Sequence, residues 1–148
     1  MPIVIDASVT MAWCFDDEST PLTDGVLDRL RDQEAFVPAL WQLEVANVLL
    51  IAERRGRITE AQATRFLDLL MQLPIRIDQS LTNVAALLAA GRRHRLTAHD
   101  AAYLLLAERI GAPLATLNSN LIAGARQPVS NWPLVTDGPP QPSRHFRP

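Results

Sequence analysis

Residues 2–9 read PIVIDASV, and this stretch decides the fold. Residues 2–5 form a short apolar run that is typical of a buried strand, and the run ends at Asp6. Ser8 can cap a helix over residues 9–15, which leaves Asp6 at the carboxyl end of the strand. A strand that ends in an acid and leads into a helix indicates an α/β domain. In such domains, sites form beyond the carboxyl ends of the strands.

Strand and helix patterns alternate along the rest of the chain. The helices are predicted from apolar spacing and from proline, threonine and glycine at their ends, and the strands from short β-branched runs. We expect helices at about residues 21–32, 40–55, 59–72, 82–94, 98–110 and 118–126. We expect further strands at about residues 35–37, 75–77, 113–117 and 134–135. Strands separated by helices require crossover connections, which predicts an α/β fold: a three-layer α/β/α arrangement with a central, mostly parallel sheet.

Length and composition limit the class of protein. The 148 residues are one domain's worth, enough to bury a core without disulfides. We find no apolar run of the roughly 20 residues that span a bilayer, and no charged leader before a hydrophobic stretch. A single cysteine, Cys14, cannot form an internal disulfide, which is typical of a reducing compartment. We therefore expect a cytoplasmic protein with one domain over residues 1–137 and a disordered, proline-rich tail over residues 138–148.

The charge of the chain argues against uniform attraction to nucleic acid. The formal net charge is −2, and all 14 basic residues are arginine, so the chain contains no lysine. An RNA partner would have to be held by local basic patches. Residues 54–57 and 92–95 are candidates, although basic residues at helix ends are more often solvated groups that complement the helix dipole.

Acidic and amide side chains occur where a site of an α/β sheet would form. Asp6 follows the first strand directly, and Asn118 follows the strand at residues 113–117 in the same way. Asp100 lies in the first turn of the helix at residues 98–110, just before an apolar run. Each also has a structural explanation. Asp6 and Asn118 can cap helices, and Asp100 can stabilise its helix by about 0.3–1 kcal/mol through interaction with the helix dipole.

Glu44 is harder to explain by structure alone. It is the only charged residue of the segment AFVPALWQLEVANVLLIA at residues 35–52. A carboxylate in so apolar a helix costs several kcal/mol unless a metal ion or hydrogen bonds compensate it. A buried arginine partner is the one comparable structural explanation. Glu44 is therefore a candidate for a functional role.

Four motifs, taken in order, give the chain a resemblance to a known family. They are DASV at residues 6–9, EVAN at 44–47, HDAAYL at 99–104 and PLATLNSNL at 113–121. With these motifs the chain resembles the PIN-domain ribonucleases, particularly the VapC-type toxins of toxin–antitoxin pairs, over about residues 3–135. The resemblance implies an α/β/α fold and an endoribonuclease that depends on Mg²⁺ or Mn²⁺ and leaves 5′-phosphate and 3′-hydroxyl ends. It also implies a homodimer, neutralised by a small antitoxin whose tail occupies the active-site groove.

The resemblance also assigns roles to single residues. Asp6, Glu44 and Asp100 match the first three acids of the family and are the candidates for catalysis and metal binding. Ser8 matches the hydroxyl beside the first acid, and Thr116 matches the residue that supports the fourth position. These residue types suit Mg²⁺, which prefers oxygen ligands and is usually held by one or two carboxylates together with phosphate. The implied substrate is RNA, whether tRNA, rRNA or mRNA.

The chain departs from the family at the fourth acid. Asn118 stands where the family commonly has Asp, and Asn120 stands where another Asp often follows. An amide oxygen can bind Mg²⁺ or a bound water but carries no charge, so we expect weaker metal binding and a weaker case for a second ion. This departure keeps open an alternative, a catalytically weakened PIN-like module that binds RNA or a partner protein.

A phosphatase is a second alternative. Residues 6–10, DASVT, loosely resemble the Asp-x-Asp-x-Thr start of haloacid-dehalogenase-like phosphatases. However, Ser8 replaces the second Asp, and the chain lacks the lysine which that family needs. The missing lysine also argues against a receiver domain and a Walker-type loop. An aspartyl-phosphate enzyme is therefore disfavoured.

Overall fold

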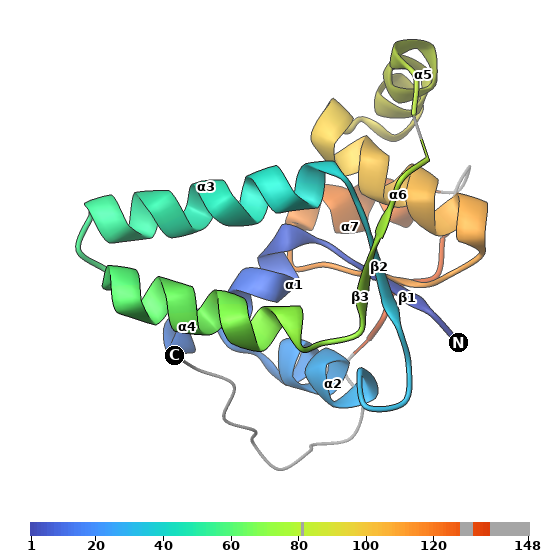
Figure 1. The fold of residues 1–148 in the computed structure, drawn as a ribbon. Coiled ribbons are helices and arrows are strands. Elements are labelled where there is room, and N and C mark those ends of the chain that lie inside the picture. The colour runs from blue at the N-terminus through green and yellow to red at the C-terminus, as the bar shows by residue number, and fades with distance from the viewer. Residues whose placement is uncertain (81, 128–131, 137–148) are drawn as a thin grey trace.

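Four short parallel strands form the central sheet of the computed structural model, which describes residues 1–80, 82–127 and 132–136 (Figure 1). The strands are β1 (Ile3–Ile5), β2 (Ala35–Pro38), β3 (Ile75–Asp78) and β4 (Leu114–Ala115), in the spatial order β3-β2-β1-β4. Val4 of β1 pairs with Phe36 on one side and with Leu114 on the other. β1 is therefore an inner strand, and all of its residues are buried.

Helices cover both faces of this sheet. They are α1 (Ala7–Ala12), α2 (Pro21–Arg29), α3 (Leu40–Arg54), α4 (Glu60–Met71), α5 (Val84–His94), α6 (Ala98–Ile110) and α7 (Ser119–Ala125), with a short 3-10 turn, η1 (Asp16–Glu18). The chain runs outward from β1 to β2 and β3 and then returns across the sheet to β4. Figure 1 shows α1–α4 on one side of the sheet and α5 and α6 on the other, where α6 packs against β1, β2 and β4. The predicted three-layer α/β/α fold with a parallel sheet is confirmed.

Helix ends fall close to their sequence signals, whereas the last strands are shorter than predicted. Thr20 and Thr59 form capping boxes at the starts of α2 and α4, and Gly111 ends α6 in the left-handed region with φ of 67°. β4 contains only Leu114–Ala115, and Leu134 forms an isolated parallel bridge to Leu114 instead of a strand. Short neighbouring segments give this edge of the sheet few backbone hydrogen bonds.

The start of α1 differs from the prediction. Asp6, not Ser8, is the N-cap, because the Asp6 side chain accepts a hydrogen bond from the backbone N–H of Val9 at 3.1 Å. Ser8 lies inside the first turn, and the helix ends at Ala12, three residues earlier than expected. One side chain therefore ends β1 and begins α1.

Buried apolar side chains from every layer form one core around the sheet. Trp13, Trp41 and Cys14 belong to it, as their apolar character favours. Within the described residues, no helix has the length and hydropathy needed to cross a membrane. The tail predicted at residues 138–148 lies outside the described residues.

α3 and α4 form a helical hairpin that projects from one side of the sheet (Figure 1). Phe66 is fully buried at its inner side, whereas Leu43 and Met71 are 73% and 76% exposed. A groove of about 540 Å³ runs along the two helices and is lined mainly by apolar residues, including Val45, Leu49, Leu50, Leu67 and Met71. The hairpin thus presents an apolar surface to solvent.

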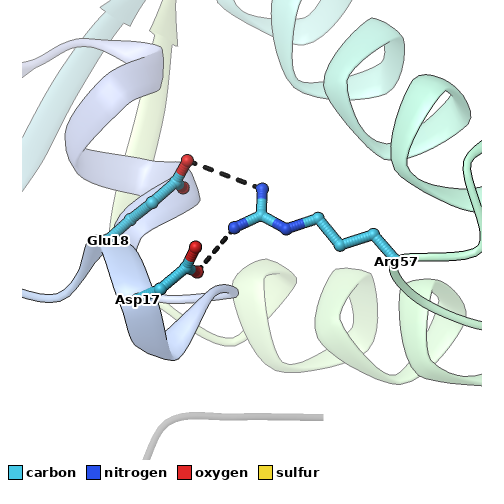
Figure 2. Close-up of polar contacts among 3 residues, drawn as sticks. All are labelled: Asp17, Glu18 and Arg57. Atoms are coloured by element: carbon cyan, nitrogen blue, oxygen red, sulfur yellow. Dashed lines mark hydrogen bonds and ion pairs between the residues drawn. The ribbon is translucent and has the colours of Figure 1, made fainter.

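The tip of the hairpin is tied to η1 by Arg57 (Figure 2). The guanidinium donates to Asp17 at 2.5 Å, lies 3.6 Å from Glu18, and stands 3.8 Å from the centre of the Phe15 ring. Arg57 of the predicted basic cluster at residues 54–57 is therefore engaged within the molecule.

The second basic cluster, at residues 92–95, contains both exposed and buried side chains. Arg92, Arg93 and Arg95 are exposed, as expected for solvated groups. His94 differs, because it is only 5% exposed and its Nδ1 has no hydrogen-bond partner within the described residues. The expectation of a solvated side chain is wrong for His94, because the end of α5 packs into the molecule, where Gln127 Nε2 donates to the His94 backbone carbonyl at 3.2 Å.

Candidate active site

Asp6 is a buried carboxylate at the carboxyl end of the inner strand β1. It is only 4% exposed. Its Oδ1 accepts hydrogen bonds from Ser8 Oγ at 2.6 Å and from the backbone N–H of Val9 at 3.1 Å, and its Oδ2 accepts one from Thr116 Oγ1 at 2.5 Å. A carboxylate offers about four lone-pair positions, two on each oxygen. Asp6 therefore keeps one acceptor position open, on Oδ2.

The electrostatic environment of Asp6 disfavours its negative charge. Burial raises the pKa of the Asp6 carboxyl above its usual value, and the negative charge of Asp100 raises it further. The hydrogen bonds from Ser8, Thr116 and Val9 act in the opposite direction but do not cancel the effect of burial. A cation beside Asp6 would relieve both causes, since it would neutralise the buried charge and the repulsion from Asp100.

Asn118 connects the Asp6 and Asp100 carboxyl groups. Its side-chain Nδ2 lies 3.4 Å from each carboxylate oxygen of Asp100, a long hydrogen-bond distance. Its backbone N–H donates to Thr116 Oγ1 at 2.9 Å, and Thr116 in turn donates to Asp6. Asn118, three residues after β4, thus connects the end of β1 and the first turn of α6.

The Asn118 side-chain oxygen is already used by α7. Oδ1 accepts hydrogen bonds from the backbone N–H groups of Asn120 and Leu121 at 2.9 and 3.2 Å, so Asn118 is the N-cap of this helix. These two bonds occupy both lone pairs of the amide oxygen. In this arrangement Asn118 offers a donor to Asp100 and has no free oxygen for a metal ion. Asn120 is exposed and contributes its backbone to the cap.

Tyr103 connects Glu44 to the helix that carries Asp100. Tyr103 is 1% exposed, and its hydroxyl donates to Glu44 Oε1 at 2.5 Å. Burial raises the pKa of the Tyr103 phenol, and the hydrogen bond to Glu44 and the charges of Glu44 and Asp6 raise it further, so the phenol remains a donor. Asp100 lies three residues earlier on the same face of α6. Tyr103 therefore belongs to the buried core and also contacts Glu44 of the candidate site.

Glu44 itself is less buried than its apolar segment indicates. It is half-buried, since α3 extends beyond the sheet and exposes 73% of the neighbouring Leu43. Its partner is the hydroxyl of Tyr103 and not an arginine. The carboxylate is thus held by one strong donor at the border between the core and solvent.

Two residues that support the site were missed by the sequence reasoning. Thr10 Oγ1 donates to the backbone carbonyl of Asp6 at 3.0 Å and accepts a hydrogen bond from Trp41 Nε1 at 3.0 Å. This chain of bonds fixes the first turn of α1 against α3. The position of Thr10, four residues after Asp6, is the usual spacing for a threonine that bonds back to its own helix, and it was the available signal. Ser8 adds another tie, because its Oγ accepts from the backbone N–H of Leu117 at 3.0 Å.

The donor set suits an ion that needs few protein ligands. Within residues 1–80, 82–127 and 132–136, no three His, Cys, Asp or Glu side chains lie close enough together to hold a metal ion. Asp6, Glu44 and Asp100 therefore do not form one compact cluster. Mg²⁺ and Mn²⁺ prefer oxygen ligands, and Mg²⁺ keeps several waters and is commonly held by one or two carboxylates. The open Oδ2 position of Asp6 and the neighbouring charge of Asp100 fit such an ion, whereas a closed four-ligand zinc site does not fit.

Comparisons with known proteins were made for sequence and for structure. The family model of the PIN domain matches residues 3–126. Ribonuclease VapC3 from Pyrobaculum aerophilum is 31% identical over 123 residues, which cover 82% of this chain and 92% of that protein. The crystal structure of PAE2754 from Pyrobaculum aerophilum aligns with a TM-score of 0.65 and 23% identity over 84% of each chain. The match to the family model extends over the segments that carry Asp6, Glu44, Asp100 and Asn118, and the structural match supports the fold.

Proposed function

Because the chain belongs to the PIN-domain family, we propose that it is an endoribonuclease that depends on Mg²⁺ or Mn²⁺. It hydrolyses phosphodiester bonds of tRNA, rRNA or mRNA in the cytoplasm, as the toxin of a toxin–antitoxin pair. The ribonuclease name of its relative VapC3 supports this activity. The observation that carries the proposal is the approach of Asp6 and Asp100 at the carboxyl edge of the sheet, where Thr116 and Asn118 join them.

In the proposed mechanism, Asp6 and Asp100 would hold the metal ion. When bound, the ion supplies electrostatic stabilisation for the charge that develops on the phosphodiester. Ser8 and Thr116 fix the Asp6 carboxylate, so its remaining acceptor position is already oriented. Among the described residues only Tyr103 donates to Glu44, through Oε1, which leaves Oε2 to orient the attacking water or to bind the ion. No nucleophilic side chain is required.

The proposed protein partners are a cognate antitoxin and a second copy of the chain. The antitoxin inhibits the enzyme, and the enzyme forms a homodimer, as family membership supports. The apolar groove of α3 and α4 and the exposed Val84 and Leu88 of α5 offer surfaces that a protein partner would cover.

The test of the proposed activity is cleavage of a mixed tRNA and rRNA pool by the purified protein in Mg²⁺, in Mn²⁺ and in EDTA. Asp6→Asn, Glu44→Gln and Asp100→Asn should each abolish the metal-dependent cleavage while circular dichroism shows an unchanged fold. Asp68→Asn removes a carboxylate from the exposed surface of α4 and serves as the matched control. Full activity in all three site variants would overturn the proposal.

A catalytically weakened module that binds RNA or a protein is the second candidate. The observation that favours it is Asn118, whose neutral side chain replaces a charged ligand and whose oxygen caps α7. Such a module would bind its partner equally well in Mg²⁺ and EDTA, and with Asp6 or Asn at position 6. Asn118→Asp separates the two candidates, because a weakened enzyme should gain metal affinity and cleavage from the added carboxylate, whereas a binding module should gain neither.

A further inference from the structure

A small cavity lies beside Thr116, the residue that donates to Asp6. Its volume is about 220 Å³, and Thr116, Arg126 and Thr136 line it together with apolar side chains that include Leu22 and Ile122. Thr116 follows β4, and Thr136 lies two residues after Leu134, which bridges β4 in parallel. The cavity therefore lies at the carboxyl edge of the sheet, where sites of this fold class form, and it shares Thr116 with the candidate active site.

Arg126 is the cationic residue of this cavity. It is exposed at the C-cap of α7, and no ion pair or side-chain hydrogen bond engages its guanidinium within the described residues. Other described arginines, by contrast, pair with acids: Arg31, Arg57, Arg76 and Arg109. A guanidinium with free donors at the mouth of a cavity is suited to phosphate, which it can bind through two parallel hydrogen bonds.

The size and lining of the cavity fit one nucleotide. Pockets for drug-sized ligands measure roughly 300–1,000 Å³, so a cavity of about 220 Å³ receives a smaller group. Apolar walls suit the faces of a base, and the arginine suits the phosphate attached to it. An acidic peptide would use the arginine but leave the apolar walls without a matching group.

We propose that this cavity binds a nucleotide of the substrate strand beside the bond that is cleaved, with Arg126 on its phosphate. The inference rests on the proposed function, because the cavity lies beside the cleaved bond only if Asp6 marks the position of the reacting phosphodiester. Arg126 is then a positioning residue. A purely structural role is the competing explanation, because an arginine at the end of α7 also complements the helix dipole. That role predicts lower stability of the Arg126→Ala protein but unchanged RNA affinity.

The experiment measures the affinity of the Asp6→Asn protein for fluorescein-labelled single-stranded RNA decamers by fluorescence anisotropy, over a range of salt concentrations. Binding is compared with and without Arg126→Ala, and with Arg65→Ala as the matched control on the exposed surface of α4. Arg126→Ala should weaken binding about ten-fold, as expected for a lost charge-assisted hydrogen bond. It should also reduce the slope of log K against log salt by about 0.7, the value for one phosphate contact on a single strand. Arg65→Ala should leave both quantities unchanged.

The outcomes separate this inference from the proposed function. Arg126-dependent binding in a protein whose wild type does not cleave RNA would support nucleotide binding in the cavity, but it would overturn the nuclease and with it the position of the cavity beside a cleaved bond. Cleavage by the wild type, together with equal RNA affinities of the Arg126→Ala and Arg65→Ala proteins, would overturn nucleotide binding in the cavity but not the nuclease activity. An absence of RNA binding to the Asp6→Asn protein at low salt would also overturn it. Unchanged RNA affinity with weaker binding of poly-glutamate in Arg126→Ala would assign the arginine to an acidic peptide instead.

Discussion

At the carboxyl edge of β1, a charged side chain is buried, whereas on the α3–α4 hairpin apolar side chains stand in solvent. Asp6 is 4% exposed and accepts three hydrogen bonds, and Leu43 and Met71 are more than 70% exposed. Charged residues usually lie at the surface and large apolar residues in the interior, and each of these two regions shows the reverse. A buried carboxylate is tolerated because hydrogen-bond donors surround it, and a bound cation would stabilise it further. Exposed apolar surface gains from a partner that covers it.

The difference teaches where rigidity is needed. The ties at Asp6 come from α1 and from the segment after β4, whose Asn118 also contacts Asp100 of α6, so several elements fix this site. The tip of the hairpin is joined to the rest of the molecule through the exposed ion pairs of Arg57 and its stacking on Phe15. Chemistry requires a fixed geometry, whereas a protein-binding surface tolerates adjustment.

Phe66→Ala should produce the largest effect because it breaks the attachment of the hairpin to the core. Phe66 is fully buried, and the loss of a buried phenyl ring with the cavity it leaves costs about 3–5 kcal/mol. Urea unfolding monitored by circular dichroism measures the loss. Leu67→Ala is the control, since its neighbour Leu67 is 45% exposed and should lose far less. Equal losses would show that the hairpin does not use Phe66 as its anchor.

Thr116→Val should destabilise the other region by about 1–3 kcal/mol. The substitution keeps the shape but removes the donor to Asp6 Oδ2 and the acceptor for the Asn118 N–H, so buried polar groups remain unsatisfied. The free energy of unfolding in EDTA measures this loss. Thr64→Val on the exposed surface of α4 should change it little. A loss no greater than that of the control would mean that water replaces the threonine hydroxyl.

Asp6→Asn should stabilise the fold by about 1 kcal/mol at pH 7 in EDTA, while it abolishes the proposed activity. Burial raises the pKa of the Asp6 carboxyl in the folded state above its ordinary value, so the folded chain binds this proton more tightly than the unfolded chain does. The stability that this proton confers is fully present below the unfolded pKa and is lost as pH rises through the folded pKa. The advantage of the Asn variant should therefore be absent near pH 3 and complete at neutral pH.

The measurement is a series of chemical unfolding experiments on both proteins between pH 3 and pH 7. A difference that grows with pH would confirm the cost of the Asp6 charge. An Asn variant that is less stable than the wild type at pH 7 would contradict the prediction, and it would mean that the hydrogen bonds of the carboxylate outweigh its burial.

Arg57→Ala should have the smallest effect, a loss of less than about 1 kcal/mol. Its ion pairs with Asp17 and Glu18 are solvent-exposed and screened, and stacking on Phe15 adds a contribution of similar size. Hydrogen exchange at the tip of the hairpin should nevertheless increase, because the contacts of Arg57 hold only this local part of the chain. Arg55→Ala, an exposed neighbour, is the control. Unchanged hydrogen exchange in Arg57→Ala would show that the contacts of Arg57 do not hold the tip of the hairpin.

The fold was largely predictable because its signals are local. Thr20 and Thr59 cap their helices through hydrogen bonds to residues three positions away, and Gly111 ends α6 through its own backbone conformation. The alternation of such helices with short apolar runs then fixes the fold class. β4 was overestimated, because its length depends on pairing with β1 and with Leu134, which the local sequence does not encode.

The site was predictable only in part. The positions of Asp6 and Asn118 follow from the ends of their strands, but the bond between Tyr103 and Glu44 joins residues 59 positions apart. Asn118 accepts hydrogen bonds from α7 with its side-chain oxygen and contacts Asp100 with its side-chain nitrogen. This division depends on how α6 and α7 are placed in space, which the spacing of residues in the sequence does not reveal. The catalytic and metal-binding roles of these residues stay predictions.

The order β3-β2-β1-β4 also has a consequence for when the protein becomes active during its synthesis. Thr116, which completes the environment of Asp6, is 110 residues away from it and follows the last strand of the sheet. A nascent chain on the ribosome therefore carries Asp6, Glu44 and even Asp100 before β4 has emerged to pair with β1. At roughly 5–20 residues per second, translation separates the first acid from its hydroxyl partner by several seconds. The proposed toxin would thus remain harmless to the ribosome that makes it until nearly the whole described domain has left the exit tunnel.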